Sequence, residues 1–456
     1  NSFTNLTTSQ LQALTTTQLQ SVDIEDLNAL STTQVRLLTT TQVQSLSATQ
    51  VAGLSTTALS SMTTLQVSNL KDTQVRALSA DQVSSLTTTQ LNKMGTAQLA
   101  AMSTDDIVAL SSAQVGALST EQISKLSLAH VQALEASEVG GWSTSQLRAL
   151  TTNQVRVLET SDVAAIGTAI ATALDTTQIN ALSDVSVAAL SSSQVALLST
   201  AQVAALSNQA IKALSTDQVS TLATKVSSFS TAQLRLLSND VVANLSSAQI
   251  SDLNTSQIKS LTAAQIGVLN TAAVGGLSTA DVAALTTDQI KAMSSDLLRA
   301  LGTSNFSALS TEQLRIITSS AVAGLTTDEL QSLSTTKLVT LTSAQIGAFT
   351  SDAFANLTTN QINAITTTQL AAVTSAQIAA LNTSQVQSIA TDRVAKLDAF
   401  QLSALGTTQM GNMTTTQVAA LTSTQVQGLS TGAIAGLSTA QIANLTTAAV
   451  GGLTTN

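Results

Sequence analysis

Residues 199–206 read STAQVAAL, and this eight-residue unit recurs along almost the whole chain of 456 residues. An apolar residue stands at every eighth position from Leu6 to Leu222. The next interval is seven residues, to Phe229, and intervals of eight then continue to Leu453. The chain therefore holds 27 octads (7–222), one heptad (223–229) and 28 octads (230–453), with the consensus Ser/Thr-Thr-x-Gln-Val-x-Ala-Leu. The internal repeat, more than the length, decides the fold.

The apolar positions within one unit predict a helix. Val203 and Leu206 are three residues apart, which places them on one face of a helix but on opposite faces of a strand. Ser199 followed by Gln202 is a capping box, in which each side chain accepts a hydrogen bond from the other residue's backbone N–H. Leu198 and Val203 have the spacing of a hydrophobic staple. Each octad is therefore predicted to form a helix of one and a half turns.

The charged residues give every unit a direction. Of 26 acidic residues, 25 lie in the first four positions of their unit, and only Asp252 lies later. Of 17 basic residues, 13 lie at the sixth or seventh position. Acids near the N-terminus and bases near the C-terminus of a helix stabilise it by about 0.3–1 kcal/mol each. A strand has only a small dipole and would not favour this order.

Such short helices need neighbours, because isolated helices below about 12–15 residues are marginal in water. One long helix is disfavoured, since eight residues overshoot two turns and the leucine stripe would rotate around it. We therefore predict an all-α solenoid of very short capped helices, one per 8-residue repeat, with small seventh-position residues allowing close approach. The alternative is a parallel β-solenoid, because Thr, Val and Ile favour strands.

One irregular unit interrupts the array. We expect a single continuous solenoid over residues 1–456, with its register break at 223–229. In that heptad Val226 and Phe229 keep the three-residue spacing, so the missing residue is expected to come from the capping segment. Both chain ends resemble cut repeats, and the chain is expected to be a segment of a longer protein.

The composition excludes several classes of chemistry. The chain has no cysteine, one histidine and 9% charged residues, with a net charge of −9. We therefore expect no enzyme, and assign no catalytic, cofactor-binding or metal-ligating residue and no cofactor. A chain with this negative charge is not expected to attract the phosphates of nucleic acid. No run of about 18 apolar residues occurs, so no membrane insertion is expected.

A few residues depart from the consensus. His130 replaces the usual Gln and is interpreted as a substitute capping partner on an exposed helix end. Trp142 replaces a core leucine after Gly140 and Gly141, and the two glycines are expected to make room for the ring. Val-Gly-Gly also occurs at 274–276 and 450–452, where close contacts or local softening are expected and no phosphate site.

Paired carboxylates raise the question of calcium. Asp105-Asp106 and Asp328-Glu329 are the clearest pairs. They lack the spacing of calcium-binding loops, and the helix dipole already explains their place in the unit. Weak calcium binding is left open as an alternative.

The units resemble the Leu-Ser/Thr-x-x-Gln-Val/Ile-x-Ala-Leu arrays of very large secreted or surface proteins of Gram-negative bacteria. That resemblance implies an extracellular, adhesin-like or fibre-forming role. Residues 150–155, LTTNQV, also resemble the first helix of the DNA-reading repeats of transcription activator-like effectors. Those repeats are about four times longer and contain a second helix, so DNA binding is not expected.

The expected function is structural. The chain is predicted to form a rod, fibre or filament, or an adhesin stalk, on the bacterial surface, with self-association by end-to-end or lateral contacts. The alternative is a binding module that presents regular Thr and Ser rows to a glycan or to ice, where repeated weak contacts add up. A scaffold that binds proteins in a superhelical groove ranks third, because the chain offers few aromatic side chains.

Overall fold

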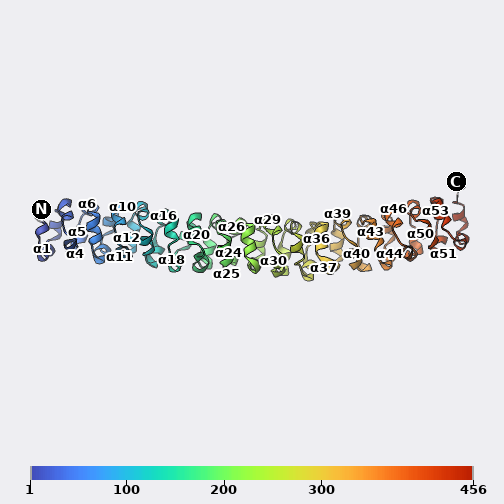
Figure 1. Ribbon diagram of the computed structural model, residues 1–456, viewed down its shortest axis with the longest axis horizontal. Coiled ribbons are helices and arrows are strands. Elements are labelled where there is room, and N and C mark those ends of the chain that lie inside the picture. The colour runs from blue at the N-terminus through green and yellow to red at the C-terminus, as the bar shows by residue number, and fades with distance from the viewer. Residues whose placement is uncertain (1–2, 454–456) are drawn as a thin grey trace. The chain divides into compact units, whose positions relative to one another are not determined.

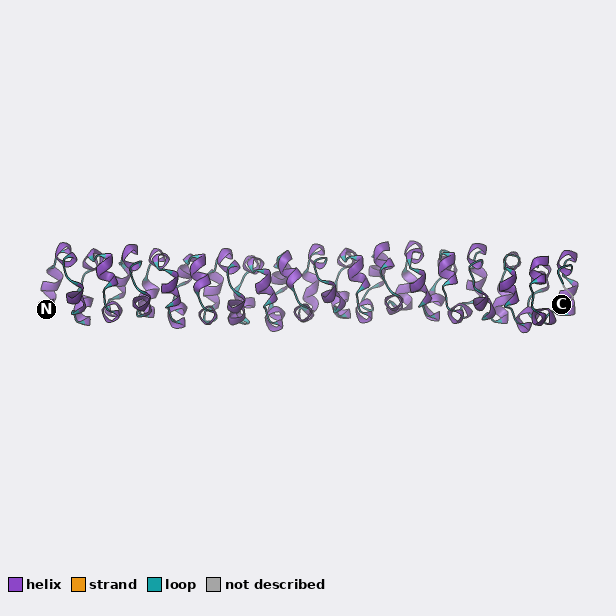
Figure 2. Ribbon diagram, turned by 90° about the horizontal axis from the view of Figure 1, so that it is seen from above, coloured by secondary structure: helices purple, strands orange, loops and turns teal. Residues whose placement is uncertain are grey.

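The computed structural model describes residues 3–453 and contains only helices and connecting segments over that range. It has 55 α-helices of four to seven residues, from α1 (Thr8–Ala13) to α55 (Thr447–Val450), and the two short 3-10 helices η1 (Phe3–Asn5) and η2 (Ala223–Ser228). Figure 2 shows one short helix after another, joined by loops. The all-α solenoid with one helix per repeat is confirmed, and the β-solenoid alternative is wrong.

The chain divides into two compact units, Asn1–Ser228 and Phe229–Asn456. The division falls within the seven-residue repeat that breaks the sequence register. Within each unit the chain advances steadily in the order of its colours (Figure 1). Each unit is therefore a solenoid in its own right, and the single continuous array over 1–456 stays a prediction.

The capping box makes the helix of each repeat, as α25 (Thr200–Ala205) illustrates. The Ser199 Oγ accepts from the Gln202 N–H at 3.2 Å, and the Gln202 Oε1 accepts from the Ser199 N–H at 2.8 Å. Ser199 and Leu206 have extended ψ angles of 161° and 135°, so the chain turns between helices at these two residues. The predicted capping is confirmed.

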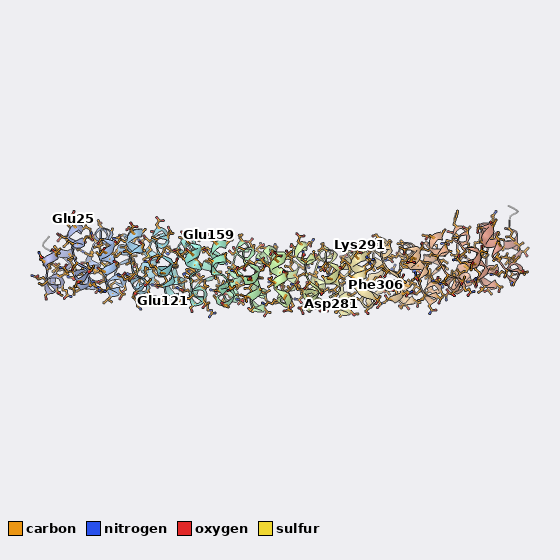
Figure 3. All side chains as sticks on the ribbon, in the orientation of Figure 1. Glu25, Glu121, Glu159, Asp281, Lys291 and Phe306 are labelled. Carbon is orange, nitrogen blue, oxygen red and sulfur yellow. The ribbon has the colours of Figure 1, made fainter. Side chains whose placement is uncertain are left out.

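The predicted apolar pair forms the core. Val203 and Leu206 are buried, as are the fifth and eighth positions of nearly every unit. Full burial of such a side chain contributes about 1.5–3 kcal/mol. In Figure 3 the exposed Glu25 and Glu121 lie at the edge of the ribbon, whereas the buried fifth-position Phe306 lies among the helices.

Successive coils are stacked by contacts between repeats three and four apart. Helix α25 packs against α22 (Thr176–Ala181), three helices earlier, and against η2, three helices later. The Gln202 side chain reaches further, to carbonyl groups of the repeat four earlier. One turn of the solenoid therefore takes between three and four repeats. The sequence alone does not give this number.

Small residues at the seventh position allow these close contacts, as expected. Gly324 stands at the seventh position of its repeat, and a Cβ there would come 2.6 Å from the Ser295 Oγ. Ser295 occupies the second position of the repeat three earlier. Gly428 has the same relation to Ala399, since a Cβ at Gly428 would lie 2.6 Å from the Ala399 Cβ. Close helix approach at this position is a recurring feature of the array.

The irregular repeat 223–229 keeps its core but changes its helix. Val226 and Phe229 are buried, as predicted from their spacing. The segment forms the 3-10 helix η2 in place of an α-helix. Leu222 stays in helical conformation (φ −66°, ψ −21°), and Ala223 makes the turn with a φ of 47°. The deletion thus removes the extended capping step, and a left-handed backbone conformation replaces it.

Candidate functional site

The feature that recurs throughout the array is a row of buried glutamine side chains. Gln202 is only 6% exposed, and its Nε2 donates to the Ala171 and Leu174 carbonyls, each at 2.8 Å. Those carbonyls belong to the fifth and eighth positions of the repeat four earlier. We call this set of coil-to-coil hydrogen bonds from fourth-position glutamines the glutamine ladder.

The ladder is present in both units. Besides Gln202, glutamines whose Nε2 donates to the two equivalent carbonyls, 31 and 28 residues earlier, include Gln42, Gln50, Gln66, Gln74, Gln82, Gln90, Gln98, Gln122, Gln154, Gln178 and Gln218 in the first unit. Those in the second unit are Gln265, Gln289, Gln313, Gln345, Gln361, Gln369, Gln377, Gln401, Gln417, Gln425 and Gln441.

Each ladder glutamine performs two tasks at once. Its Oε1 caps its own helix, and its Nε2 satisfies carbonyls that are buried between coils. A hydrogen bond of this kind contributes about 0.5–1.5 kcal/mol, and an unpartnered buried carbonyl costs about 1–3 kcal/mol. Sequence reasoning assigned only the capping task. The missed signal is that Glu caps a helix as well as Gln does, yet Gln dominates the fourth position, which indicates a need for an amide donor.

Other donors take the place of glutamine in some repeats. The Lys225 Nζ donates to the Ala196 carbonyl at 2.6 Å, the Asn305 Nδ2 to the Leu277 carbonyl at 2.8 Å, and the Lys337 Nζ to the Ser307 carbonyl. Lys225 and Lys337 were exceptions to the rule that bases lie late in each unit. Their donation to carbonyls of an earlier coil explains why a basic residue stands near a helix N-terminus.

His130 stands at the fourth position of its repeat, the position of the ladder glutamines, which we call the ladder position. Its interpretation as an exposed capping partner was wrong. The side chain is 5% exposed, and its Nε2 lies 3.1 Å from the Met102 carbonyl oxygen of the repeat four earlier. The Ser127 Oγ still accepts from the His130 N–H, but no reciprocal bond from the ring to Ser127 completes the capping box. Within residues 3–453 the Nδ1 of His130 is buried without a hydrogen-bond partner. The ring is too short and rigid to perform both tasks.

We predict that His130→Gln stabilises the first unit by about 1–2 kcal/mol, because glutamine restores the capping bond and removes a buried unpartnered nitrogen. Thermal or urea unfolding of the full chain measures the change. The matched control is Gln209→Ala, since Gln209 is an exposed third-position residue. A His130→Gln variant no more stable than the parent would contradict this assignment.

Trp142 fills the core, as expected, and the room that Gly140 and Gly141 give its ring stays a prediction. A Cβ at Gly140 would lie 2.9 Å from the carbonyl oxygen of Ala165, which belongs to the repeat three later. A Cβ at Gly276 would overlap the Ser247 carbonyl of the repeat three earlier. These glycines therefore allow backbones of adjacent coils to touch, which confirms the expected close contacts.

The carboxylate pairs divide between two environments. Asp105 and Asp328 are exposed, whereas Asp106 and Glu329 are buried at the ladder position. The Asp106 Oδ2 accepts from the Ser103 N–H at 2.8 Å, so the capping bond is kept. Within the described range, no three His, Cys, Asp or Glu side chains gather as metal ligands would.

The surroundings of Asp175, Glu138 and Asp162 shift the pKa values of these three carboxyl groups in different directions. Asp175 is an exposed first-position cap, and hydrogen bonds from the Thr177 hydroxyl and the Gln178 N–H lower its pKa. Glu138 and Asp162 occupy the ladder position, where desolvation by burial raises the pKa of each carboxyl. The first environment favours the charged form of an acid, and the second opposes it.

The surface is hollowed by shallow grooves between coils. One groove in the second unit, of about 440 Å³, is lined mainly by capping segments, and its lining includes the polar residues Asn356, Thr358, Asn382 and Ser384. None of the helices formed by residues 3–453 is both long enough and apolar enough to cross a bilayer.

Comparison with protein families finds a similar repeat in parts of the chain. Six segments match the family model described as ALTTAQ repeat, at residues 21–56, 91–128, 187–224, 263–295, 322–359 and 394–431. Residues 284–289, ALTTDQ, come within one residue of that name and run from the seventh position of one octad to the fourth of the next. No curated protein matches.

Two solved structures align over most of the chain but differ from it in geometry. One, titled as a homology model of the full-length AP-3 complex in an intermediate open conformation, has 10% identity, covers 89% of this chain and 76% of its own, and has a TM-score of 0.19. The structure of APUM23-GGAAUUGACGG has 10% identity, covers 88% and 91%, and has a TM-score of 0.17. The chain is thus a helical repeat array whose six matched segments are similar to the ALTTAQ repeat.

Proposed function

We propose that this chain is a structural repeat protein of the bacterial cell surface, which forms a rod, fibre or filament, or the stalk of an adhesin. The observation that carries the proposal is that the side chains recurring from repeat to repeat make their contacts within the array itself. Ser and Thr cap helices, Val and Leu fill the core, and Gln joins the coils. The side chains that recur from repeat to repeat thus serve to hold the array together, which suits a mechanical role.

The pattern of contacts supports a load-bearing array. Most helices pack against the helix three repeats away, and ladder glutamines bond the repeat four earlier, so stability is approximately a sum over near neighbours, as in other repeat arrays. Tension along a solenoid acts on the glutamine ladder, which crosses from coil to coil. Many such bonds in parallel and in series distribute the load over identical units.

The exposed surface supports self-association outside the cell. Charged residues make up 9% of the chain, and the exposed positions are mostly Thr, Ser, Ala and Gln. Weak mutual repulsion allows such chains to pack laterally or end to end. The absence of cysteine from the sequence also removes any dependence on disulfide formation after secretion.

Electron microscopy of the full chain tests the proposal, first in solution at increasing concentration and then displayed on cells. We expect thin rods that join into longer or thicker assemblies. Dispersed monomers at every concentration, together with no fibres on cells, would contradict the structural role.

A second candidate is glycan binding, which the hydroxyl- and amide-lined groove around Asn356 and Asn382 favours. Such grooves lie between capping segments, so weak binding at one of them would be strengthened by its neighbours. A glycan array tests this candidate, and a thermal-hysteresis assay tests the related ice-binding alternative. Binding to a defined glycan by the full chain would favour the module over the inert rod.

A further inference from the structure

Two acidic repeats lie one coil apart in the first unit. Repeat 135–142 begins with Glu135 and carries Glu138 at the ladder position, while repeat 159–166 begins with Glu159 and carries Asp162 there. Their helices, α17 (Ala136–Val139) and α20 (Thr160–Ile166), pack directly against each other. Of the other acids at the ladder position, only Asp26 also follows an acidic first-position residue, which is Asp23.

Both ladder carboxylates occupy the glutamine site. Glu138 is 5% exposed and Asp162 is 2% exposed. The Glu138 Oε2 accepts from the Glu135 N–H, and the Asp162 Oδ2 accepts from the Glu159 N–H, each at 2.8 Å. Both carboxylates therefore keep the capping hydrogen bond that the glutamine Oε1 makes in a regular repeat.

An ionised acid at this position cannot make the hydrogen bonds that the glutamine Nε2 donates to the repeat four earlier. In regular repeats the ladder amide bonds carbonyls 31 and 28 residues earlier. The same register assigns Ile107 and Leu110 to Glu138, and Val131 and Leu134 to Asp162. A carboxylate has no hydrogen to donate, whereas a carboxylic acid has one O–H.

We propose that repeats 135–142 and 159–166 form an acid-stabilised joint, in which protonation of Glu138 and Asp162 turns each carboxyl into a donor to the carbonyls of the repeat four earlier. Each carboxylate takes one proton from solvent, and the new O–H completes one ladder bond. No other group changes its protonation in this step. At neutral pH the joint is the weaker point of the array, and on acidification it tightens.

The surrounding charges reinforce this behaviour. Against α17 pack α14 (Ser112–Gly116), which has no charged side chain, and α20 with Asp162. The repeat four before it, around α13 (Thr104–Val108), adds Asp105 and Asp106. No basic side chain on these elements offsets the ionised form of Glu138.

The charged side chains around Asp162 are also acidic, and the one basic residue type among its neighbours is a histidine. Against α20 pack α17, α21 (Ala169–Ala173), which has no charge, and α23 (Asp184–Ala188) with Asp184. The repeat four earlier, around α16 (Leu128–Ala133), carries His130, whose ring is itself committed to a carbonyl.

The pH dependence follows from the direction of the shifts. Burial raises the pKa of both carboxyls more than the hydrogen bonds from the Glu135 and Glu159 backbone N–H groups lower it, and the charges of the Glu135 and Glu159 side chains add a smaller raising effect. The folded chain thus binds these protons more tightly than the unfolded chain. Their stabilising contribution is complete below the ordinary values of 4.5 for Glu and 3.8 for Asp, and is lost as pH rises through the raised pKa.

Hydrogen exchange of the full chain tests the joint, with Glu138→Gln/Asp162→Gln compared with the parent. The amides to follow lie in 103–110, 127–142 and 159–166. We expect their protection factors to be about five- to tenfold higher in the variant at about pH 7, and to differ less than about twofold at about pH 4. Comparison at equal pH cancels the titration of all other carboxylates.

The control is Glu121→Gln/Asp217→Gln, because both residues are exposed at third positions. This variant is expected to match the parent at both pH values. The proposal is overturned if the ladder variant shows no gain at about pH 7, or if its gain persists undiminished at about pH 4. The glutamine variants restore the consensus, so loss of folding does not obscure the result.

Discussion

Replacing Gln202 by leucine is expected to lower the free energy of unfolding of the first unit by about 2–4 kcal/mol. The substitution leaves the Ser199 N–H without its side-chain acceptor and the Ala171 and Leu174 carbonyls without their donor. Leucine regains part of the loss through apolar burial, but it satisfies none of these three groups. The loss is expected to appear in repeats 167–174 and 199–206 together.

Gln202→Glu separates the two tasks of the side chain. Glutamate keeps the capping acceptor and loses the ladder donor while it is ionised. At neutral pH it should be about as damaging as leucine, and acidification should restore part of its stability but none of that of Gln202→Leu. Urea unfolding and hydrogen exchange of the full chain measure both effects.

The matched control for Gln202→Leu is Gln209→Leu, since Gln209 is an exposed third-position residue in the following repeat. We expect a change within about 0.5 kcal/mol there. Equal losses at the two sites would show that glutamine serves only general helix stability.

Gly276→Ala is expected to destabilise the second unit by about 1–3 kcal/mol. A Cβ at this position would overlap the carbonyl oxygen of Ser247, three repeats earlier. The obstacle is backbone, so no rotamer change relieves it, and the two coils must move apart. Thermal unfolding of the full chain measures the loss.

Gly116→Ala provides the opposite case on the same scaffold. Gly116 ends α14, and a Cβ there meets nothing within 4 Å. Alanine at a free helical position is expected to stabilise by about 0.4–1 kcal/mol, through higher helix propensity and a less flexible unfolded chain. If both substitutions shifted stability in the same direction, coil-to-coil contact would not be what requires glycine at position 276.

The local structure of each repeat was predictable because its causes lie within eight residues. The spacing of Val203 and Leu206, the Ser199–Gln202 capping box and the order of charges all act inside one helix. Each of them pointed to the same structure, which is typical of a sequence that specifies one fold. The core positions and the helix boundaries followed directly.

The relation between coils was not predictable in the same way. Whether a turn takes three or four repeats depends on the backbone dihedral angles where one helix joins the next, at the eighth and first positions of each repeat. Small differences in these angles add up over many residues. The donor role of Gln202 and the burial of His130 both follow from that geometry. Once the separation of about four repeats is known, the preference for Gln over Glu at the fourth position becomes intelligible.

A crystal structure of the chain that resolves the side-chain amides tests the glutamine ladder most directly. The Nε2 of Gln202 is expected at 2.8 Å from both the Ala171 and the Leu174 carbonyl oxygens, with its Oε1 on the Ser199 N–H. Fourth-position amides that point into solvent, with those carbonyls bound to water, would contradict the ladder as the link between coils.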